Sequence, residues 1–282
     1  RLVESIGIMG KYSDHLSKRI NTWGPKEGYC AICRKPAKLT REHVPPASCG
    51  NVSKVVVRSL TSSEDKRYTT TSQGGLNYRT TCSSCNNDWL GQKYDPALAE
   101  LFNEVKLLAE SVSKGYLSLP PCKTYFVRPQ RLARSVIGHI LAGNAVDIVQ
   151  QDTPHAPMYQ VMADYFFDET SPLPDEIEIY YWFYPFNDIR IARAFGSKFG
   201  AAEPIVGDLL KFFPFAFWVT WNQPKDINLN LGKLLPTRDL SIDEPSQLTI
   251  NFDSYPPIYF PEAPQENGMT VFNSKMVAVG TK

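Results

Sequence analysis

The sequence lacks any hydrophobic run long enough to cross a membrane. Its longest strongly apolar stretch is Leu209–Trp221, which spans 13 residues and contains Lys211 and Pro214. A membrane-spanning helix needs about 20 predominantly apolar residues. The first eight residues also lack the basic-then-apolar pattern of a secretory signal. We therefore expect a cytoplasmic protein with no membrane partner.

Several patterns typical of common enzyme and repeat classes are absent as well. We find no internal repeat, no glycine-rich phosphate loop and no Ser-His-Asp pattern. Hydrophobic residues make up 43% of the chain and charged residues 21%, which excludes wholesale disorder. The 22 prolines and the 12% of aromatic residues favour interrupted strands and loops over a long helical bundle.

Net charge is nearly absent from the chain as a whole, but its two parts differ in sign. The formal charge is +1, from 30 basic and 29 acidic residues. Residues 1–95 hold 15 of the basic and 8 of the acidic residues, so the remainder holds 15 and 21. A basic N-terminal third beside an acidic remainder indicates a module that faces a polyanion, joined to a second region.

Cysteine is scarce, but four of the six cysteines form two C-x-x-C pairs. Cys30 and Cys33 form the first pair and Cys82 and Cys85 the second, with 48 residues between the pairs. Two intervening residues let a tight turn aim both sulfurs at one tetrahedral ion, and the missing export signal disfavours disulfides. We therefore predict a structural zinc site with four thiolate ligands and no open position for water. Cys49 is expected to be an ordinary small side chain, although it lies close enough in the sequence to be a minor candidate ligand.

The residues around these cysteines form a further pattern. Glu42-His43-Val44-Pro45-Pro46 follows the first pair, Asn77 lies five residues before Cys82, and Asn86 directly follows Cys85. This pattern resembles the HNH endonuclease family, which has an acidic-His-apolar element, an Asn before a C-x-x-C pair and a His or Asn directly after it. The resemblance covers about residues 28–95 and makes the chain an H-N-N variant.

The chemistry of phosphodiester hydrolysis suits these residue types. It needs an activated water, a cation on the scissile phosphate and stabilisation of the leaving oxygen. Imidazole as a residue type suits a general base for water near neutral pH, so His43 is the candidate. Glu42 and the amide oxygen of Asn86 are oxygen donors of the kind that Mg²⁺ or Mn²⁺ prefers, so they are the candidate ligands of a catalytic ion. Asn77 is expected to hydrogen-bond backbone in the His-bearing loop and to orient the imidazole.

Basic residues near this motif are candidate contacts to nucleic-acid phosphates. Trp89 stands where the family often has lysine, and Lys93, one helical turn further on, is the candidate substitute. For the polar stretch Cys49–Gln73, the alternative to phosphate binding is a solvated mobile loop. The predicted nucleic-acid contacts are Arg41, Lys54, Arg58, Arg79 and Lys93.

The expected fold is α+β. Residues 9–115, counted from Met9 as the candidate natural start, would form the HNH domain: a ββα-metal module with its zinc site, and the following helix. Its two strands would be Lys38–His43 and a segment ending near Cys82, and its helix would open at Asn86–Gln92 and continue as Pro96–Lys114.

Residues 116–282 would form a second, α+β domain that is largely β. A helix is predicted at Pro129–Val149, in which His139 is expected to be a core or interface histidine. The two most aromatic runs, Tyr180–Phe186 and Phe212–Trp221, are expected to be buried central strands or an interface. The predicted strands are Met158–Phe167, Ile177–Pro185, Ile189–Phe195, Phe212–Trp221, Gln247–Phe252 and Met269–Val279.

The leading functional hypothesis is a metal-dependent endonuclease that hydrolyses DNA, using zinc for structure and Mg²⁺ or Mn²⁺ for catalysis. A role in defence against phages or mobile elements follows only by analogy with other multidomain nucleases. Two alternatives stay open: a non-catalytic zinc module that binds nucleic acid or protein, and an RNA endonuclease. The C-terminal region has an open role in recognition, sensing or oligomerisation. A homodimer or a regulatory partner would then bind through it.

Overall fold

A computed structural model describes eight parts of the chain: residue 22 and residues 24–58, 69–143, 155–198, 203–224, 227–262, 269–272 and 279–280. The fold is mixed α and β, and every strand pairing in these parts is antiparallel. Across these same residues, none of the helices combines the length and the apolar character that crossing a membrane requires.

The N-terminal part is built on a three-stranded sheet in the order β1-β2-β5. Its strands are β1 (Glu27–Tyr29), β2 (Pro36–His43) and β5 (Asn77–Cys82). A second hairpin, β3 (Val55–Arg58) with β4 (Thr69–Ser72), lies between β2 and β5 in the chain. The two predicted strands, one after the first cysteine pair and one ending at the second pair, therefore correspond to β2 and β5.

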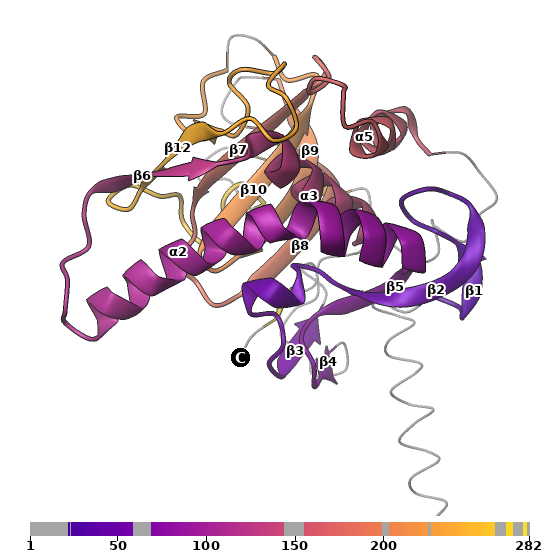
Figure 1. The fold of residues 1–282 in the computed structure, drawn as a ribbon, viewed down its shortest axis with the longest axis horizontal. Helices are drawn as coiled ribbons and strands as arrows, with labels where there is room; N and C mark the ends of the chain where they lie inside the picture. Colours follow the sequence, from indigo (N-terminus) through magenta and orange to yellow (C-terminus); the bar gives the residue numbers. More distant parts are fainter. Residues whose placement is uncertain are drawn as a thin grey trace, which may run out of the picture.

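A long helical segment follows β5. It begins as the π-helix η3 (Ser84–Tyr94) and continues as α2 (Asp95–Ser113), with Pro96 in the first turn of α2, where a missing N–H costs nothing. A short 3₁₀ helix, η1 (Ala47–Cys49), precedes β3. The first part of this segment, η3, lies beside β5, and the C-terminal end of α2 points away from the three-stranded sheet (Figure 1). The segment agrees with the predicted helix.

The C-terminal part contains a seven-stranded sheet in the order β11-β7-β10-β9-β8-β13, with β14 also paired to β8. The aromatic runs form β7 and β10, which are adjacent in this sheet and largely buried, as predicted. A separate two-stranded sheet joins β6 (Cys122–Val127) to β12 (Ser246–Asn251). The bounds in the large sheet are β7 (Ile177–Phe183), β8 (Ile189–Lys198), β9 (Ile205–Phe212), β10 (Phe215–Trp221), β11 (Gly232–Lys233), β13 (Met269–Phe272) and β14 (Val279–Gly280).

The predicted strand Met158–Phe167 is wrong, because this segment forms helix α5 (Pro157–Phe167). Its buried residues include Met162, Ala163 and Phe166, which recur at helical spacing and form one face. The high aromatic content had indicated a strand, but the spacing of the apolar side chains decided the element. Strands β3, β4, β6, β9 and β11 were not predicted from the sequence.

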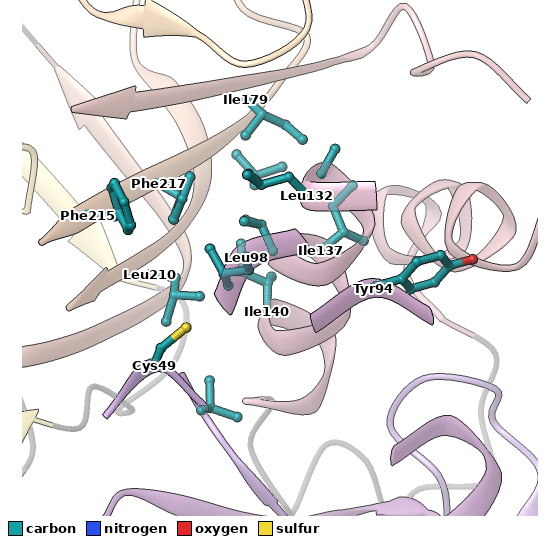
Figure 2. Packing of buried hydrophobic residues seen from close by; sticks show 14 of the residues in the cluster. Cys49, Tyr94, Leu98, Leu132, Ile137, Ile140, Ile179, Leu210, Phe215 and Phe217 are labelled. Carbon is teal, nitrogen blue, oxygen red and sulfur yellow. The ribbon is translucent and has the colours of Figure 1, made fainter. Parts of the chain in front are cut away.

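Helix α3 (Pro129–Ala142) lies at the centre of the molecule and is buried at every position from Leu132 to Ala142. It packs against α2, η3, α5 and β9. Figure 2 shows side chains of α2 and α3 facing side chains of the large sheet across one continuous core. The regions predicted as separate domains, residues 9–115 and 116–282, therefore share this core. The residues of these elements labelled in Figure 2 are Leu98, Leu132, Ile137, Ile140, Ile179, Leu210, Phe215 and Phe217.

Candidate functional site

The four paired cysteines come together as the sequence analysis predicted. One sulfur from each of Cys30, Cys33, Cys82 and Cys85 lies within 4.8 Å of the others. The Sγ atoms of Cys33 and Cys82 are 3.9 Å apart. A tetrahedral Zn²⁺ with bonds of about 2.3 Å to sulfur holds its sulfurs about 3.8 Å apart, so the cluster has the size of a metal site.

The backbone around these sulfurs suits thiolate ligands. The N–H groups of Ile32 and Cys82 donate to Cys30 Sγ at 3.5 and 3.3 Å, and the N–H of Cys85 donates to Cys82 Sγ at 3.5 Å. The cluster connects the β1–β2 turn to the end of β5 and the first turn of η3, so a bound metal would fix the start of the helix relative to β2.

His43 is the last residue of β2 and is half-buried. Its Nε2 atom lies 2.8 Å from the carbonyl oxygen of Gly74. Because a carbonyl only accepts hydrogen bonds, Nε2 must carry the proton of the neutral imidazole, and Nδ1 keeps its lone pair. Within the described residues, no hydrogen bond occupies Nδ1. The imidazole is therefore held in the tautomer and orientation in which Nδ1 can accept a proton.

Asn77 faces His43 across the β2–β5 pairing. Its amide nitrogen donates to the carbonyl oxygen of Gly75 at 3.2 Å and to Ser72 Oγ at 3.4 Å. The Ser72 hydroxyl also donates to that carbonyl oxygen, at 2.5 Å. Asn77 was expected on the backbone of the His-bearing loop. In the structure it supports the Gly74-Gly75 turn, whose Gly74 carbonyl in turn orients the imidazole.

Sequence reasoning missed a second support of this turn, Asn51. Its side chain, with 3% of the residue exposed, donates to the carbonyl oxygens of Pro45 at 2.7 Å and Leu76 at 2.8 Å, and accepts from the Leu76 N–H at 2.7 Å. Gly75 has φ +80°, and a Cβ there would lie 2.1 Å from the Asn51 carbonyl oxygen. The adjacent glycines were the only sequence signal of this tight turn, and nothing in the pattern pointed to Asn51.

Asn86 lies in the first turns of η3 and is partly buried. Its amide nitrogen donates to Thr40 Oγ1 at 2.9 Å and to the Arg41 carbonyl oxygen at 2.8 Å. The Thr40 hydroxyl donates its proton to the Thr81 carbonyl oxygen, so Thr40 Oγ1 can only accept from Asn86. The Arg41 carbonyl oxygen is an acceptor as well. This fixes the amide with its nitrogen toward β2. No described residue donates to the amide oxygen, so that oxygen is available to a ligand.

Glu42, the other predicted ligand of the catalytic ion, lies elsewhere. Successive side chains of a strand point to opposite faces, and Glu42 is 5% exposed where His43 is half-buried. Its carboxylate lies with Asp95 and His139, and one ligand atom from each of the three is within 4.8 Å of the others. Burial raises the pKa of Glu42 to about 8. No hydrogen bond among the described residues joins Glu42 to Asn86.

The predicted nucleic-acid contacts differ in exposure. The side chains of Arg41 and Lys54 are exposed, and Arg41 also interacts within the protein. Arg79 is partly buried and donates from Nε to the Gly24 carbonyl oxygen at 2.6 Å. Lys93 pairs with Glu169 at 2.8 Å, and its Nζ lies 3.9 Å from the centre of the Trp89 ring. The last two are thus engaged within the protein. The side chain of Arg58 lies outside the described residues.

Comparison of the chain with protein-family models, with curated proteins and with solved structures gave no match in any of the three. The resemblance to HNH endonucleases therefore rests on the residues and contacts described above.

Proposed function

We propose that the protein is a metal-dependent HNH-type endonuclease that hydrolyses DNA phosphodiester bonds. The observation that supports this most directly is the state of His43. The Gly74 carbonyl, 2.8 Å from Nε2, orients the imidazole and leaves Nδ1 unprotonated. A general base needs this arrangement, with one nitrogen anchored and the other open to a reacting water. General acid–base catalysis of this kind contributes about 10²–10⁴-fold to a rate.

Zinc is the ion that the four-cysteine cluster suits best. Four thiolates complete its coordination and leave no position for a reacting water, so the ion would act on structure alone. It would hold the first turn of η3 against β2. In that position Asn86 reaches the backbone of Arg41, two residues before the base.

A catalytic Mg²⁺ or Mn²⁺ is also part of the proposal. Such an ion would neutralise charge on the scissile phosphate. Of the two oxygen donors that the sequence indicated, the amide oxygen of Asn86 suits this ion, because no described residue donates to it. Glu42 does not suit it as placed, since its carboxylate is buried beside His139 and Asp95. Waters and substrate phosphates would have to supply the other ligands, as they commonly do for Mg²⁺.

The remaining parts of the proposal are drawn from the sequence. Arg41 and Lys54, which are exposed, would contact backbone phosphates. The cytoplasmic location, the role in defence, and the recognition or dimerisation through residues 116–282 stay predictions.

Cleavage of supercoiled plasmid by purified protein tests the proposal. With Mg²⁺ or Mn²⁺ present, the wild type should nick or linearise the plasmid. His43→Ala, at matched zinc content, should be slower by about 10²–10⁴-fold. Asn86→Ala should also be slower, by about 10-fold or more, because a ligand to the ion is lost.

Asn87→Ala is the matched control. Asn87 is the next residue of the same helix, is exposed, and reaches only Ser83 through its amide. It should cleave at the wild-type rate. If the wild type binds plasmid but never cuts it, the nuclease proposal fails in favour of a binding module. If it cuts RNA and leaves DNA intact, the substrate class is wrong.

A further inference from the structure

Three ionisable side chains meet in the interior beside the candidate base. Glu42 comes from β2, Asp95 from the first turn of α2 and His139 from α3. The relative exposure of these residues is 5%, 8% and 0%. Their elements meet where the N-terminal end of α2 lies beside β2 (Figure 1). We propose that Glu42 and His139 Nδ1 are the protein ligands of a second metal site, distinct from the four cysteines, that binds a divalent transition-metal ion, and that Asp95 orients the imidazole.

Two atoms in this cluster lack the hydrogen bonds that buried polar atoms normally make. Glu42 Oε2 and His139 Nδ1 are both buried and have no hydrogen-bond partner. The Nδ1 atom faces Glu42, with Oε1 3.8 Å away, which is too long for a hydrogen bond. A buried polar atom without a partner costs about 1–3 kcal/mol. A cation bound between Glu42 Oε2 and His139 Nδ1 would supply the partner that both atoms lack.

The contacts on the far side of the imidazole fit metal binding. His139 Nε2 lies 2.9 Å from Asp95 Oδ1, and the Ser135 hydroxyl donates to the same oxygen at 2.7 Å. A carboxylate that accepts the proton of one imidazole nitrogen leaves the other nitrogen unprotonated and oriented, which is the usual support of a metal-bound histidine. Here that other nitrogen is Nδ1, which faces Glu42.

The charge of the cluster indicates which ligand it would take. Two buried carboxylates are costly without compensation, and a divalent cation balances both of them beside a neutral imidazole. One imidazole nitrogen with carboxylate oxygens is a donor set for Mn²⁺, Fe²⁺ or Zn²⁺, whereas Mg²⁺ prefers oxygen alone. One ligand atom from each residue already lies within 4.8 Å of the others.

Such an ion would connect α3 to β2 immediately before His43. This role differs from that of the catalytic ion proposed at Asn86, and it does not depend on nuclease activity. The competing interpretation is a metal-free cluster in which protons shared between the carboxylates and His139 balance the charge.

Metal content distinguishes the two. The full chain is stripped of metal, reloaded with Co²⁺ and analysed by elemental analysis together with absorption spectroscopy. The wild type should bind a second equivalent of Co²⁺ that adds no intensity to the sulfur-to-cobalt charge-transfer band. His139→Gln should lose that equivalent and keep the charge-transfer band. Cys33→Ser should lose the band and keep the second equivalent. His155→Gln, a histidine outside the cluster, should retain both.

A second measurement, made on the wild-type chain, tests the proposal if a variant fails to fold. Wild-type chain whose cysteines are already filled with zinc is titrated with Mn²⁺ and followed by electron paramagnetic resonance. One tightly bound Mn²⁺ per chain is expected, and Asn86→Ala should bind it equally well. A wild type that binds no tight Mn²⁺ and no second Co²⁺ overturns the proposal. So does an equivalent that persists in folded His139→Gln.

Discussion

Three asparagines surround the candidate base, and each holds a different piece of backbone. Asn77 bonds the Gly75 carbonyl, Asn86 bonds the Arg41 carbonyl, and Asn51 bonds both Pro45 and Leu76. Asparagine suits this work because its amide donates and accepts at once and carries no charge to be desolvated. The position of His43 thus depends on neutral hydrogen bonds that have little sensitivity to salt.

Asn51 is the most deeply buried of the three, which leads to a stability prediction. Asn51→Ala leaves the Pro45 carbonyl oxygen and the Leu76 N–H without a partner, whereas the Leu76 carbonyl oxygen keeps the Val44 N–H at 3.1 Å. Because each buried group left unsatisfied costs about 1–3 kcal/mol, we expect the free energy of unfolding to fall by at least about 2 kcal/mol. Urea denaturation followed by circular dichroism measures this.

The exposed Asn87 again provides the control, since Asn87→Ala should change stability by no more than about 0.5 kcal/mol. Equal stability of the two variants would show that water replaces the bonds of Asn51. The turn at Gly74-Gly75 would then need another explanation for its fixed geometry.

At the scale of the element, α3 depends on a glycine where it crosses its neighbours. A Cβ at Gly138 would lie 2.6 Å from Leu90 Cδ2 and 2.6 Å from Phe166 Cε2. Phe166 cannot easily move, because its ring packs against two other aromatic rings. The distance between ring centres is 6.1 Å to Trp89 and 5.2 Å to Tyr94. The glycine therefore lets α3 approach η3 and α5 closely and brings the adjacent His139 to Glu42.

Gly138→Ala should destabilise the protein even though alanine favours helix. The gain in helix propensity is about 1 kcal/mol, whereas overpacking a core costs about 1–3 kcal/mol. We expect a net loss of about 1 kcal/mol, measured as a lower melting temperature. Gly91→Ala is the contrast, because a Cβ there meets only Asn86 O, at 3.4 Å. It should leave stability unchanged or raise it by up to about 1 kcal/mol. Equal melting temperatures for the two variants would contradict close packing at Gly138.

The elements that could be predicted from the sequence are those with strong local signals. The resemblance to HNH endonucleases located β2, β5 and the helix after Cys85, and apolar periodicity located α2 and α3. Helix α5 was missed because aromatic residues suit strands and its helical spacing was given less weight. The Glu42–Asp95–His139 cluster could not be foreseen, since it joins segments that meet only through tertiary packing. For the same reason the sequence did not show that the Glu42 carboxylate lies beside Asp95 and His139.

At the scale of the whole molecule, one core connects the cysteine cluster to the large sheet. The continuous buried cluster includes Cys30 and Cys85 as well as Phe215 and Phe217 of β10. Helix α3 lies between the two parts and contacts both η3 and β9. A domain boundary after the helix that follows the cysteine motif, near residue 115 as predicted, would expose the apolar face of α2. The two regions should therefore unfold together.

Zinc removal tests this cooperativity. A ligand at 1,000 times its Kd stabilises a fold by about 4 kcal/mol, and in a chain of this size that corresponds to about 10 °C in melting temperature. Cys33→Ser should lower the melting temperature by about that amount. Cys122→Ser, at an exposed cysteine outside the cluster, should leave it unchanged. The change should appear equally in tryptophan fluorescence measured in a Trp89→Phe background, because Trp182, Trp218 and Trp221 then report from β7 and β10 without the contribution of Trp89 in η3. Two transitions, with only the first sensitive to zinc and the fluorescence following the second, would show instead that the sheet folds without the cysteine module. The shared buried cluster would then be a contact between two domains, and the cysteine module would be separable from the large sheet.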